Sequence, residues 1–495
     1  MKKTRFFILL LAFVLVFSLF GRSNAKETES EPDLTIAMKS PSMNFVKLVN
    51  RYKNETGKKV KIMSGSDLDT KLNMELLSGE GPDLIQGTEI PYWLLAERGA
   101  LADIAELIEN DPDMSMDDFF ENIINPLKDE EGHLYIMPCS FIIFFAMINE
   151  QLFEKAGISI PEEWTLENLI ETCIEFTKSE DKPSDTYAMF WGNEVLSMAV
   201  KDELMSAIDF SGKTSNMDMI DDLILEYLAE PSIISSNNTY ANPMTALYDI
   251  SPYLYFTETL PLLSYICGAT AIIFENDQYE VRNFPRSKHN QGEYFYRLEY
   301  AFCINKAGNV DEAWQFMKYL LSEEVQTGSV TEIYVFDNPV NKKAAEKRID
   351  MIRDDVEELV RSIKEGSPKD RWLEQSKHSP DEYMTHINRF IDTYIRLRDA
   401  LTTPVIVDAV LEESLLSAIE RVGGDNFDAS KVRKEVSRIV DVYMNEEGGD
   451  IQTGYIVIYI ILGGIFVITV SAVIIVTIKR RRNVKRAASG VAKGE

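Results

Sequence analysis

Apart from two long apolar runs near its ends, the chain shows short hydrophobic stretches separated by polar residues. The first long run, residues 6–20, carries no charge and follows the basic start Met1–Arg5. It ends before Ser23-Asn24-Ala25, whose small residues complete the layout of a secretory signal. Because the run is shorter than the roughly 20 residues that span a bilayer, we expect cleavage after Ala25 rather than an uncleaved anchor.

The second run, residues 455–478, contains no charged residue and is predicted to be a transmembrane helix. At about 1.5 Å per residue it would extend roughly 36 Å, which crosses a bilayer with some tilt. Tyr455 and Tyr459 lie at one end, and the basic tail 479–495 follows the other. The positive-inside rule therefore places the tail in the cytoplasm and the N-terminal part outside. A buried core helix is the alternative, which the basic stop disfavours.

Between the two runs, the hydrophobic pattern alternates between the periods of strands and helices. Residues 34–38 and 59–63 are typical of strands, and residues 44–56 between them place apolar side chains on one helical face. A helix over 67–77 and a strand over 83–85 follow, which predicts a parallel sheet covered by helices. Further strands are expected over 132–138 and 141–149, and further helices over 92–99, 104–109, 150–156, 164–177, 311–321, 344–364, 380–398, 405–422 and 429–445.

The net charge of -29 is distributed unevenly along the chain. The first 25 residues hold four basic and no acidic residues, and residues 479–495 hold seven basic and one acidic. The remaining part, residues 26–478, therefore holds 40 basic and 79 acidic groups, a net of -39. Such a surface repels nucleic acid, so a nucleic-acid partner is excluded.

Size and cysteine usage limit the architecture further. About 420 extracellular residues are too many for one hydrophobic core, so two lobes or more are expected. The four cysteines are scattered and none forms a CxxC pair, which predicts no metal site. We expect buried thiols; one disulfide remains the alternative. No cofactor motif occurs, so no cofactor is expected.

Seven short motifs follow one another over about 310 residues of the chain. They are the helix end at 52–60, the turn Gly79-Glu80-Gly81-Pro82-Asp83, the stretch Gly99-Ala100-Leu101-Ala102-Asp103-Ile104, residues 131–138, Phe153-Glu154-Lys155-Ala156-Gly157 with Trp164-Thr165, residues 313–326, and Asn338-Pro339-Val340-Asn341. Their order resembles that in the extracellular solute-binding proteins of ABC importers, in particular the maltose-binding-protein-like, carbohydrate-type family.

This resemblance implies an α/β fold: a two-lobe periplasmic-binding-protein-like (Venus flytrap) ectodomain that closes on its ligand, here with one C-terminal transmembrane helix added. The expected boundaries are signal peptide 1–25, disordered lead-in 26–32, first part of lobe 1 33–139, first part of lobe 2 140–290, return segment of lobe 1 291–337, helical C-terminal part of lobe 2 338–445, linker 446–454, transmembrane helix 455–478 and cytoplasmic tail 479–495.

Sugar sites combine aromatic faces with fixed hydrogen-bonding groups, and in α/β lobes they lie at the carboxyl ends of strands. Trp93 and Trp191 could instead be core residues, and Glu89 a solvated charge. The stretch 39–42 lacks the aromatic or acidic pair that is frequent in sugar binders, which leaves the ligand class open. The candidate ligand-binding residues are Ser40, Asn44, Glu89, Trp93, Phe141, Trp191, Glu194 and Tyr253.

The resemblance implies a receptor that binds a small molecule, with an oligosaccharide as the expected ligand, and that serves ABC permease subunits in the membrane. It is not expected to be an enzyme, because the four histidines are far apart and no nucleophile elbow or phosphate loop occurs. A sensory or adhesive module that uses the same fold is the alternative, and a surface hydrolase is a further one.

Overall fold

The computed structural model describes residues 31–65, 68, 72, 75–76, 80–90, 92–182, 188–190, 192–209, 214–230, 254–257, 279–290, 292–328, 336, 338–364, 379–405, 409–423 and 427–446. The expected signal peptide and transmembrane helix, most of the lead-in and linker, and the tail lie outside these residues. No helix within the described part is both long enough and apolar enough to cross a membrane.

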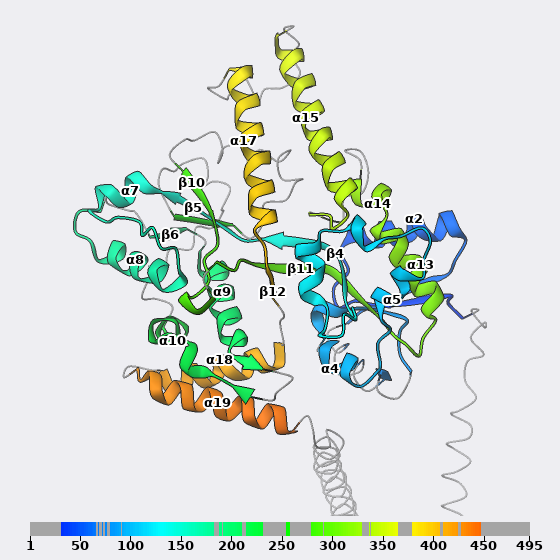
Figure 1. The fold of residues 1–495 in the computed structure, drawn as a ribbon, viewed down its shortest axis with the longest axis horizontal. Coiled ribbons are helices and arrows are strands. Elements are labelled where there is room, and N and C mark those ends of the chain that lie inside the picture. Colours follow the sequence, from blue (N-terminus) through cyan, green and yellow to red (C-terminus); the bar gives the residue numbers. More distant parts are fainter. Residues whose placement is uncertain are drawn as a thin grey trace, which may run out of the picture. The chain divides into compact units, whose positions relative to one another are not determined.

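The chain divides into two compact units (Figure 1). Unit 1 comprises the described residues up to Phe144 and from Phe295 to 405, and unit 2 those between 145 and 257, between 277 and 294, and from 409 onward. The expected boundaries placed all of 338–445 in the second lobe. Residues 338–405 instead group with unit 1, because their last strand pairs with the sheet of that unit.

Unit 1 is built on a mixed sheet with the strand order β12-β11-β3-β1-β2, in which β4 pairs with β11 as well. The pairs β1–β2 and β1–β3 are parallel, as expected. Strands β11 and β12, which the sequence analysis did not predict, pair in parallel, and β11 runs antiparallel to both β3 and β4. The strands are β1 (Leu34–Ala37), β2 (Val60–Met63), β3 (Leu84–Gln86), β4 (Met137–Ile143), β11 (Phe295–Ile304) and β12 (Thr403–Val405).

The helices of unit 1 follow the spacing of apolar residues in the sequence, as α2 illustrates. Helix α2 begins after Ser42, whose side chain accepts from the amide of Phe45, and ends at Gly57 with φ 74°. Its buried face, which includes Phe45 and Tyr52, is the predicted one. The unit contains α2 (Met43–Thr56), η1 (Gly87–Glu89), α4 (Tyr92–Glu97), α5 (Ile104–Glu109), η2 (Met116–Asp118), α6 (Glu121–Ile124), η3 (Asn125–Leu127), α13 (Val310–Leu321), α14 (Glu323–Thr327), α15 (Lys342–Lys364) and α17 (Pro380–Asp399).

Helices α15 and α17 lie side by side in Figure 1 and each buries one apolar stripe, which includes Ile352 and Val356 on α15 and Phe390 and Tyr394 on α17. Helix α17 starts with a capping box. The Ser379 side chain accepts a hydrogen bond from the amide of Glu382, and the Glu382 carboxylate accepts one from the amide of Ser379. Two long helices of this kind stabilise each other by burying their facing stripes.

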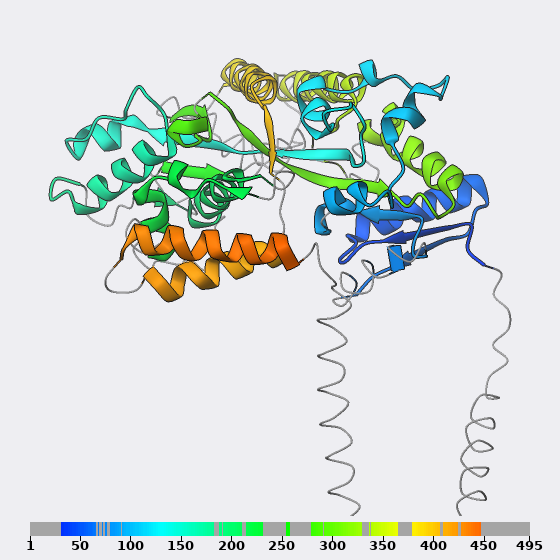
Figure 2. The same cartoon turned by 60° about the horizontal axis from the view of Figure 1, so that its bottom comes forward.

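Unit 2 contains a four-stranded sheet in the order β10-β5-β9-β6 and a two-stranded pair, β7–β8. Helices α18 and α19 lie along each other in both views (Figures 1 and 2). The helix expected over 405–422 begins only at Ala409, since β12 occupies residues 403–405. The elements are β5 (Phe145–Asn149), α7 (Glu150–Lys155), α8 (Leu166–Lys178), β6 (Met189–Phe190), α9 (Gly192–Ser206), β7 (Ile208–Asp209), β8 (Thr214–Ser215), η4 (Met217–Met219), α10 (Asp222–Ala229), β9 (Leu254–Thr257), β10 (Tyr279–Asn283), η7 (Lys288–Asn290), α18 (Ala409–Gly423) and α19 (Ala429–Glu446).

The cysteines of the described residues are buried free thiols, as expected. Cys139, Cys173 and Cys303 are each fully buried, and burial raises the pKa of each thiol far above its usual value. Such thiols are poor nucleophiles, so these three act as small core residues. Cys267 lies outside the described residues.

Asp83, the last residue of the Gly-Pro-Asp turn, links β3 to β1 and to the start of α13 through hydrogen bonds. Its Oδ2 accepts from both the backbone amide and the hydroxyl of Thr35 at 2.7 Å, and its Oδ1 accepts from the amide of Asn309 at 2.7 Å. A Cβ at Gly308 would lie 2.7 Å from Oδ1, so only glycine fits beside the carboxylate. The carboxylate thus holds β1 and the start of α13 against β3.

We expect Asp83→Asn to lower the free energy of unfolding by about 1–3 kcal/mol, because an amide cannot accept hydrogen bonds on both sides and would leave donors unpaired. Asp103→Asn is the matched control: Oδ1 of Asp103 alone accepts from the amides of Ala105 and Leu134, at 2.9 and 3.0 Å, so an asparagine oxygen can replace it. Urea unfolding followed by tryptophan fluorescence measures both. Equal losses would contradict this role of Asp83.

Candidate functional site

The first candidate residues lie where β1 ends. Ser40 is exposed and follows the strand by three positions. Asn44 is the second residue of α2 and is also exposed, with its side-chain oxygen 3.5 Å from Nζ of Lys47. Both residues therefore lie on the surface of unit 1 at the carboxyl end of β1, as predicted.

The second pair of candidates follows β3. Glu89 ends the short helix η1, although its side chain is outside the described part, and Trp93 is half-buried in α4. The start of η1 fits tightly against β11, since a Cβ at Gly87 would lie 2.6 Å from Sγ of Cys303. The backbone at the carboxyl end of β3 is thus fixed by close packing.

Tyr300 reaches the same edge of the sheet, although the sequence analysis did not name it. Because β11 runs antiparallel to β3 and Phe302 pairs with Gln86, the preceding Tyr300 lies beyond the carboxyl end of β3. It is the one non-glycine residue of positive φ among those described, at 46°. A left-handed tyrosine inside a strand is strained, and such strain persists only where the surroundings enforce it.

The contacts of Tyr300 show what enforces it. Its hydroxyl donates to Oγ of Ser42 at 2.9 Å, the atom that also caps α2. Its ring stacks on Phe45 at 5.6 Å with an interplanar angle of 8°, and meets Phe336 edge-on. The half-buried ring of Tyr300 is thereby held beside the start of α2. Ser40 and Asn44 belong to this same part of the chain.

Polar groups continue along this edge from β4. Oγ of Ser140 donates to Glu299 at 2.9 Å and accepts from the amide of Asn338 at 3.3 Å. The side-chain amide of Asn338 donates to the carbonyl of Phe141 at 2.8 Å. Segment 338–341, which belongs to one of the family-like motifs, therefore fixes the strand that carries Ser140.

Phe141 itself lies in the core of unit 1. Its side chain is 0% exposed and its ring meets Phe120 and Tyr296 edge-on, at centroid distances of 6.5 and 6.4 Å. In this structure the ring packs between core residues, whereas the neighbouring Ser140 bonds to the half-buried Glu299.

Three candidates belong to unit 2. Trp191 and Tyr253 lie outside the described residues. The backbone of Glu194 is in the first turn of α9, but its side chain is not among those described. These three residues stay predictions.

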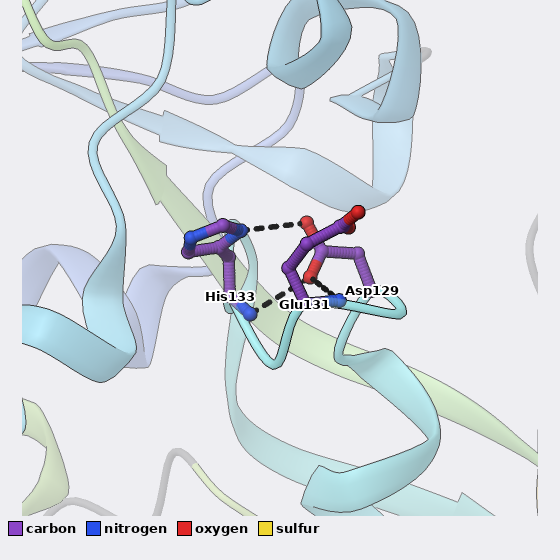
Figure 3. A group of neighbouring side chains, drawn as sticks. All are labelled: Asp129, Glu131 and His133. Atoms are coloured by element: carbon purple, nitrogen blue, oxygen red, sulfur yellow. Dashed lines mark hydrogen bonds and ion pairs between the residues drawn. The ribbon is translucent and has the colours of Figure 1, made fainter.

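A loop of unit 1 brings together groups that can bind a cation. Asp129, Glu131 and His133 each offer a ligand atom within 4.8 Å of the others (Figure 3). Oδ2 of Asp129 lies 3.0 Å from Nδ1 of His133, a hydrogen bond that raises the pKa of the imidazole. Burial alone would raise the pKa of Asp129, but hydrogen bonds from His133 and the backbone outweigh it and lower that pKa. The hydrogen bonds between Asp129 and His133 are sufficient to explain why these side chains lie close together at the surface.

Solved structures of similar fold are solute-binding proteins. One is a candidate oligosaccharide periplasmic-binding protein from Synechococcus sp. MITs9220, with a TM-score of 0.52 and 13% identity, covering 84% of this chain and 99% of that one. Another is a Streptococcus pneumoniae solute-binding protein in complex with the blood group A-trisaccharide, with a TM-score of 0.51 and 15% identity, covering 82% and 99%. The fold is therefore the two-lobe α/β fold of binding proteins.

The family follows from the sequence of the chain. Residues 40–327, more than half of the 495, match the model of the bacterial extracellular solute-binding protein family, and the chain belongs to this family. It is a family of binding proteins, not of enzymes. No curated protein shows a significant match to the chain.

We expect Tyr300→Phe to lower the free energy of unfolding by about 1 kcal/mol, because it removes only the hydrogen bond to Ser42 and keeps the ring. Tyr135→Phe, in a half-buried tyrosine beside the 129–133 loop, is the matched control and should change stability little. Urea unfolding of both variants measures the difference. An unchanged Tyr300→Phe variant would show that Ser42 does not restrain the strained residue.

Proposed function

We propose that the protein is a membrane-anchored extracellular receptor that binds an oligosaccharide and delivers it to an ABC permease. The carboxyl edge of the unit 1 sheet carries this proposal. Ser40 and Asn44 are exposed at the carboxyl end of β1, and the half-buried Glu299 and fixed ring of Tyr300 lie on β11 beyond the carboxyl end of β3. Ser140 is fully buried and holds Glu299 by a hydrogen bond. Aromatic faces and fixed hydrogen-bonding groups are what a sugar ring requires.

The likeness to known proteins supports the same ligand class. The family binds solutes outside the cell, and the Streptococcus pneumoniae relative of this fold holds a trisaccharide. The strongly acidic composition of residues 26–478 suits a soluble domain that must stay free of anionic surfaces. The apolar run 455–478 with its basic stop supports the proposed anchor.

The ligand class can be tested by thermal unfolding of the full chain in detergent micelles with neutral oligosaccharides, amino acids, peptides and polyamines. A ligand that binds only the folded state at a hundredfold excess over Kd stabilises it by about 2.7 kcal/mol. We expect a neutral oligosaccharide to raise the unfolding temperature. A shift with another class instead would reject the sugar proposal, and no shift at all would favour a sensory or adhesive role.

Asn44→Ala should raise the Kd for the ligand about three- to tenfold, since one hydrogen bond contributes about 0.5–1.5 kcal/mol. Asn54→Ala, also exposed and near the other end of α2, is the matched control and should bind as the wild type does. Titration calorimetry measures both Kd values. Equal affinity of the two variants would remove Asn44 from the site without affecting the family assignment.

The anchor has its own test. Truncation after Glu446 removes the linker, the apolar run and the basic tail. We expect the truncated chain to appear in the culture medium, whereas the full chain sediments with membranes and is extracted only by detergent. A truncated chain that still sediments with membranes would show that residues 455–478 are not what attaches the protein.

A further inference from the structure

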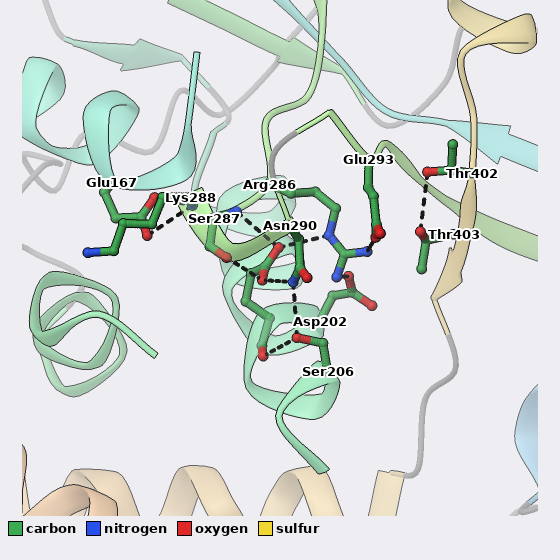
Figure 4. A network of polar contacts seen from close by, with 11 residues as sticks. Glu167, Asp202, Ser206, Arg286, Ser287, Lys288, Asn290, Glu293, Thr402 and Thr403 are labelled. Atoms are coloured by element: carbon green, nitrogen blue, oxygen red, sulfur yellow. Dashed lines mark hydrogen bonds and ion pairs between the residues drawn. The ribbon is translucent and has the colours of Figure 1, made fainter. Parts of the chain in front are cut away.

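Unit 2 contains a buried cluster of charged side chains centred on Arg286 (Figure 4). The guanidinium is 2% exposed and follows β10. Its Nε lies 2.8 Å from Glu203, its Nη2 2.9 Å from Asp202, and its Nη1 3.3 Å from Glu293. One cation therefore faces three carboxylates, two of which come from adjacent residues of α9.

Glu203 is the best bonded of the three. Besides Arg286, its two oxygens accept from the amide of Ser287 at 3.1 Å, from the hydroxyl of Ser287 at 2.8 Å and from the side-chain amide of Asn290 at 2.6 Å. These bonds attach the last turn of α9 to residues 286–290. The cluster thus adds a polar attachment at one end of α9, which carries the candidate Glu194 at its other end.

Asp202 differs from Glu203 because no backbone or side-chain amide or hydroxyl group of the described residues donates to it. It is 8% exposed, and its Oδ2, although 2.9 Å from Arg286, is not aligned for a hydrogen bond. Burial raises the pKa of Asp202 to about 7; Arg286 opposes the shift, and the charges of Glu203 and Glu293 add to it.

The other elements packed against α9 leave this balance unchanged. Strand β9 carries no charged residue, and the acids of β7 and α10 (Asp209, Asp222 and Glu226) are exposed to solvent. Lys201, beside Asp202 on the helix, pairs with Glu412 of α18 at 2.6 Å. Among the residues that the structure describes, the second carboxylate of the pair 202–203 is therefore an excess negative charge in a nearly buried site.

We propose that this cluster is a pH-responsive clasp, in which protonation of Asp202 strengthens the attachment of α9 to residues 286–290. The folded unit holds the proton up to a higher pH than the unfolded chain does. The added stability is present at pH values below the ordinary pKa of an aspartate and is lost as the pH rises through the raised pKa. The inference concerns unit 2 itself and goes beyond ligand binding.

Hydrogen exchange of the full chain in detergent micelles, read by mass spectrometry on peptides from residues 192–209, tests the clasp. After correction for the intrinsic effect of pH on exchange, the opening constant should rise by up to about tenfold per pH unit between about pH 4.5 and 6.5, and level off above about pH 7. Asp202→Asn, which resembles the protonated form, should remove this dependence. A wild-type opening constant that does not change with pH would overturn the proposal.

Two further variants keep the test decisive. Glu412→Gln breaks the neighbouring ion pair with Lys201 and should leave the pH dependence as it is. Glu293→Gln removes one charge that raises the pKa of Asp202, and because its side chain is 51% exposed it should fold. It should move the pH window to lower values. An unmoved window in this variant, or a wild-type slope in Asp202→Asn, would show that Asp202 is not the titrating group.

Discussion

The carboxylate of Asp83 is the constraint on which the first unit depends. It is one group that must satisfy donors from two distant parts of the chain, Thr35 and Asn309, and both of its oxygens are used. With that contact made, β1 and β3 lie in fixed register and α13 starts where β11 ends. Ser40 and Glu89 follow the other, carboxyl ends of β1 and β3. The contact of Asp83 at the amino ends of these strands therefore helps to position the backbone that carries both residues.

Much of unit 1 could be predicted because its order is local. Helix α2 has its apolar residues at helical spacing, a serine cap before it and Gly57 after it, so both its ends and its buried face are encoded within sixteen residues. The antiparallel course of β11 could not be predicted in this way. Its partners in β3 and β4 lie more than 150 residues earlier in the chain, and an apolar strand pattern carries no information about direction.

The site was partly predictable for the same reason. Strand ends place Ser40, Asn44 and Glu89 at one edge, whatever packs around them. Tyr300 was missed because its positive φ depends on tertiary contacts with Ser42 and Phe45. These partners are far away in the chain, and the residues next to Tyr300 give no sign of them. The burial of Asp202 could not be predicted because the chain has 80 acidic residues, and the fold decides which of them are buried.

The position of β11 has a consequence for how the protein is made. This strand pairs with β3, β4 and β12, whose residues extend from 84 to 405, so the sheet of unit 1 stays incomplete until residue 405 has been synthesised. Until β11 has been made, the edges of β3 and β4 that it covers have no partner, and open strand edges invite pairing with other chains. The nascent chain is therefore open to aggregation until residues 295–304 have been made, well past the middle of the sequence.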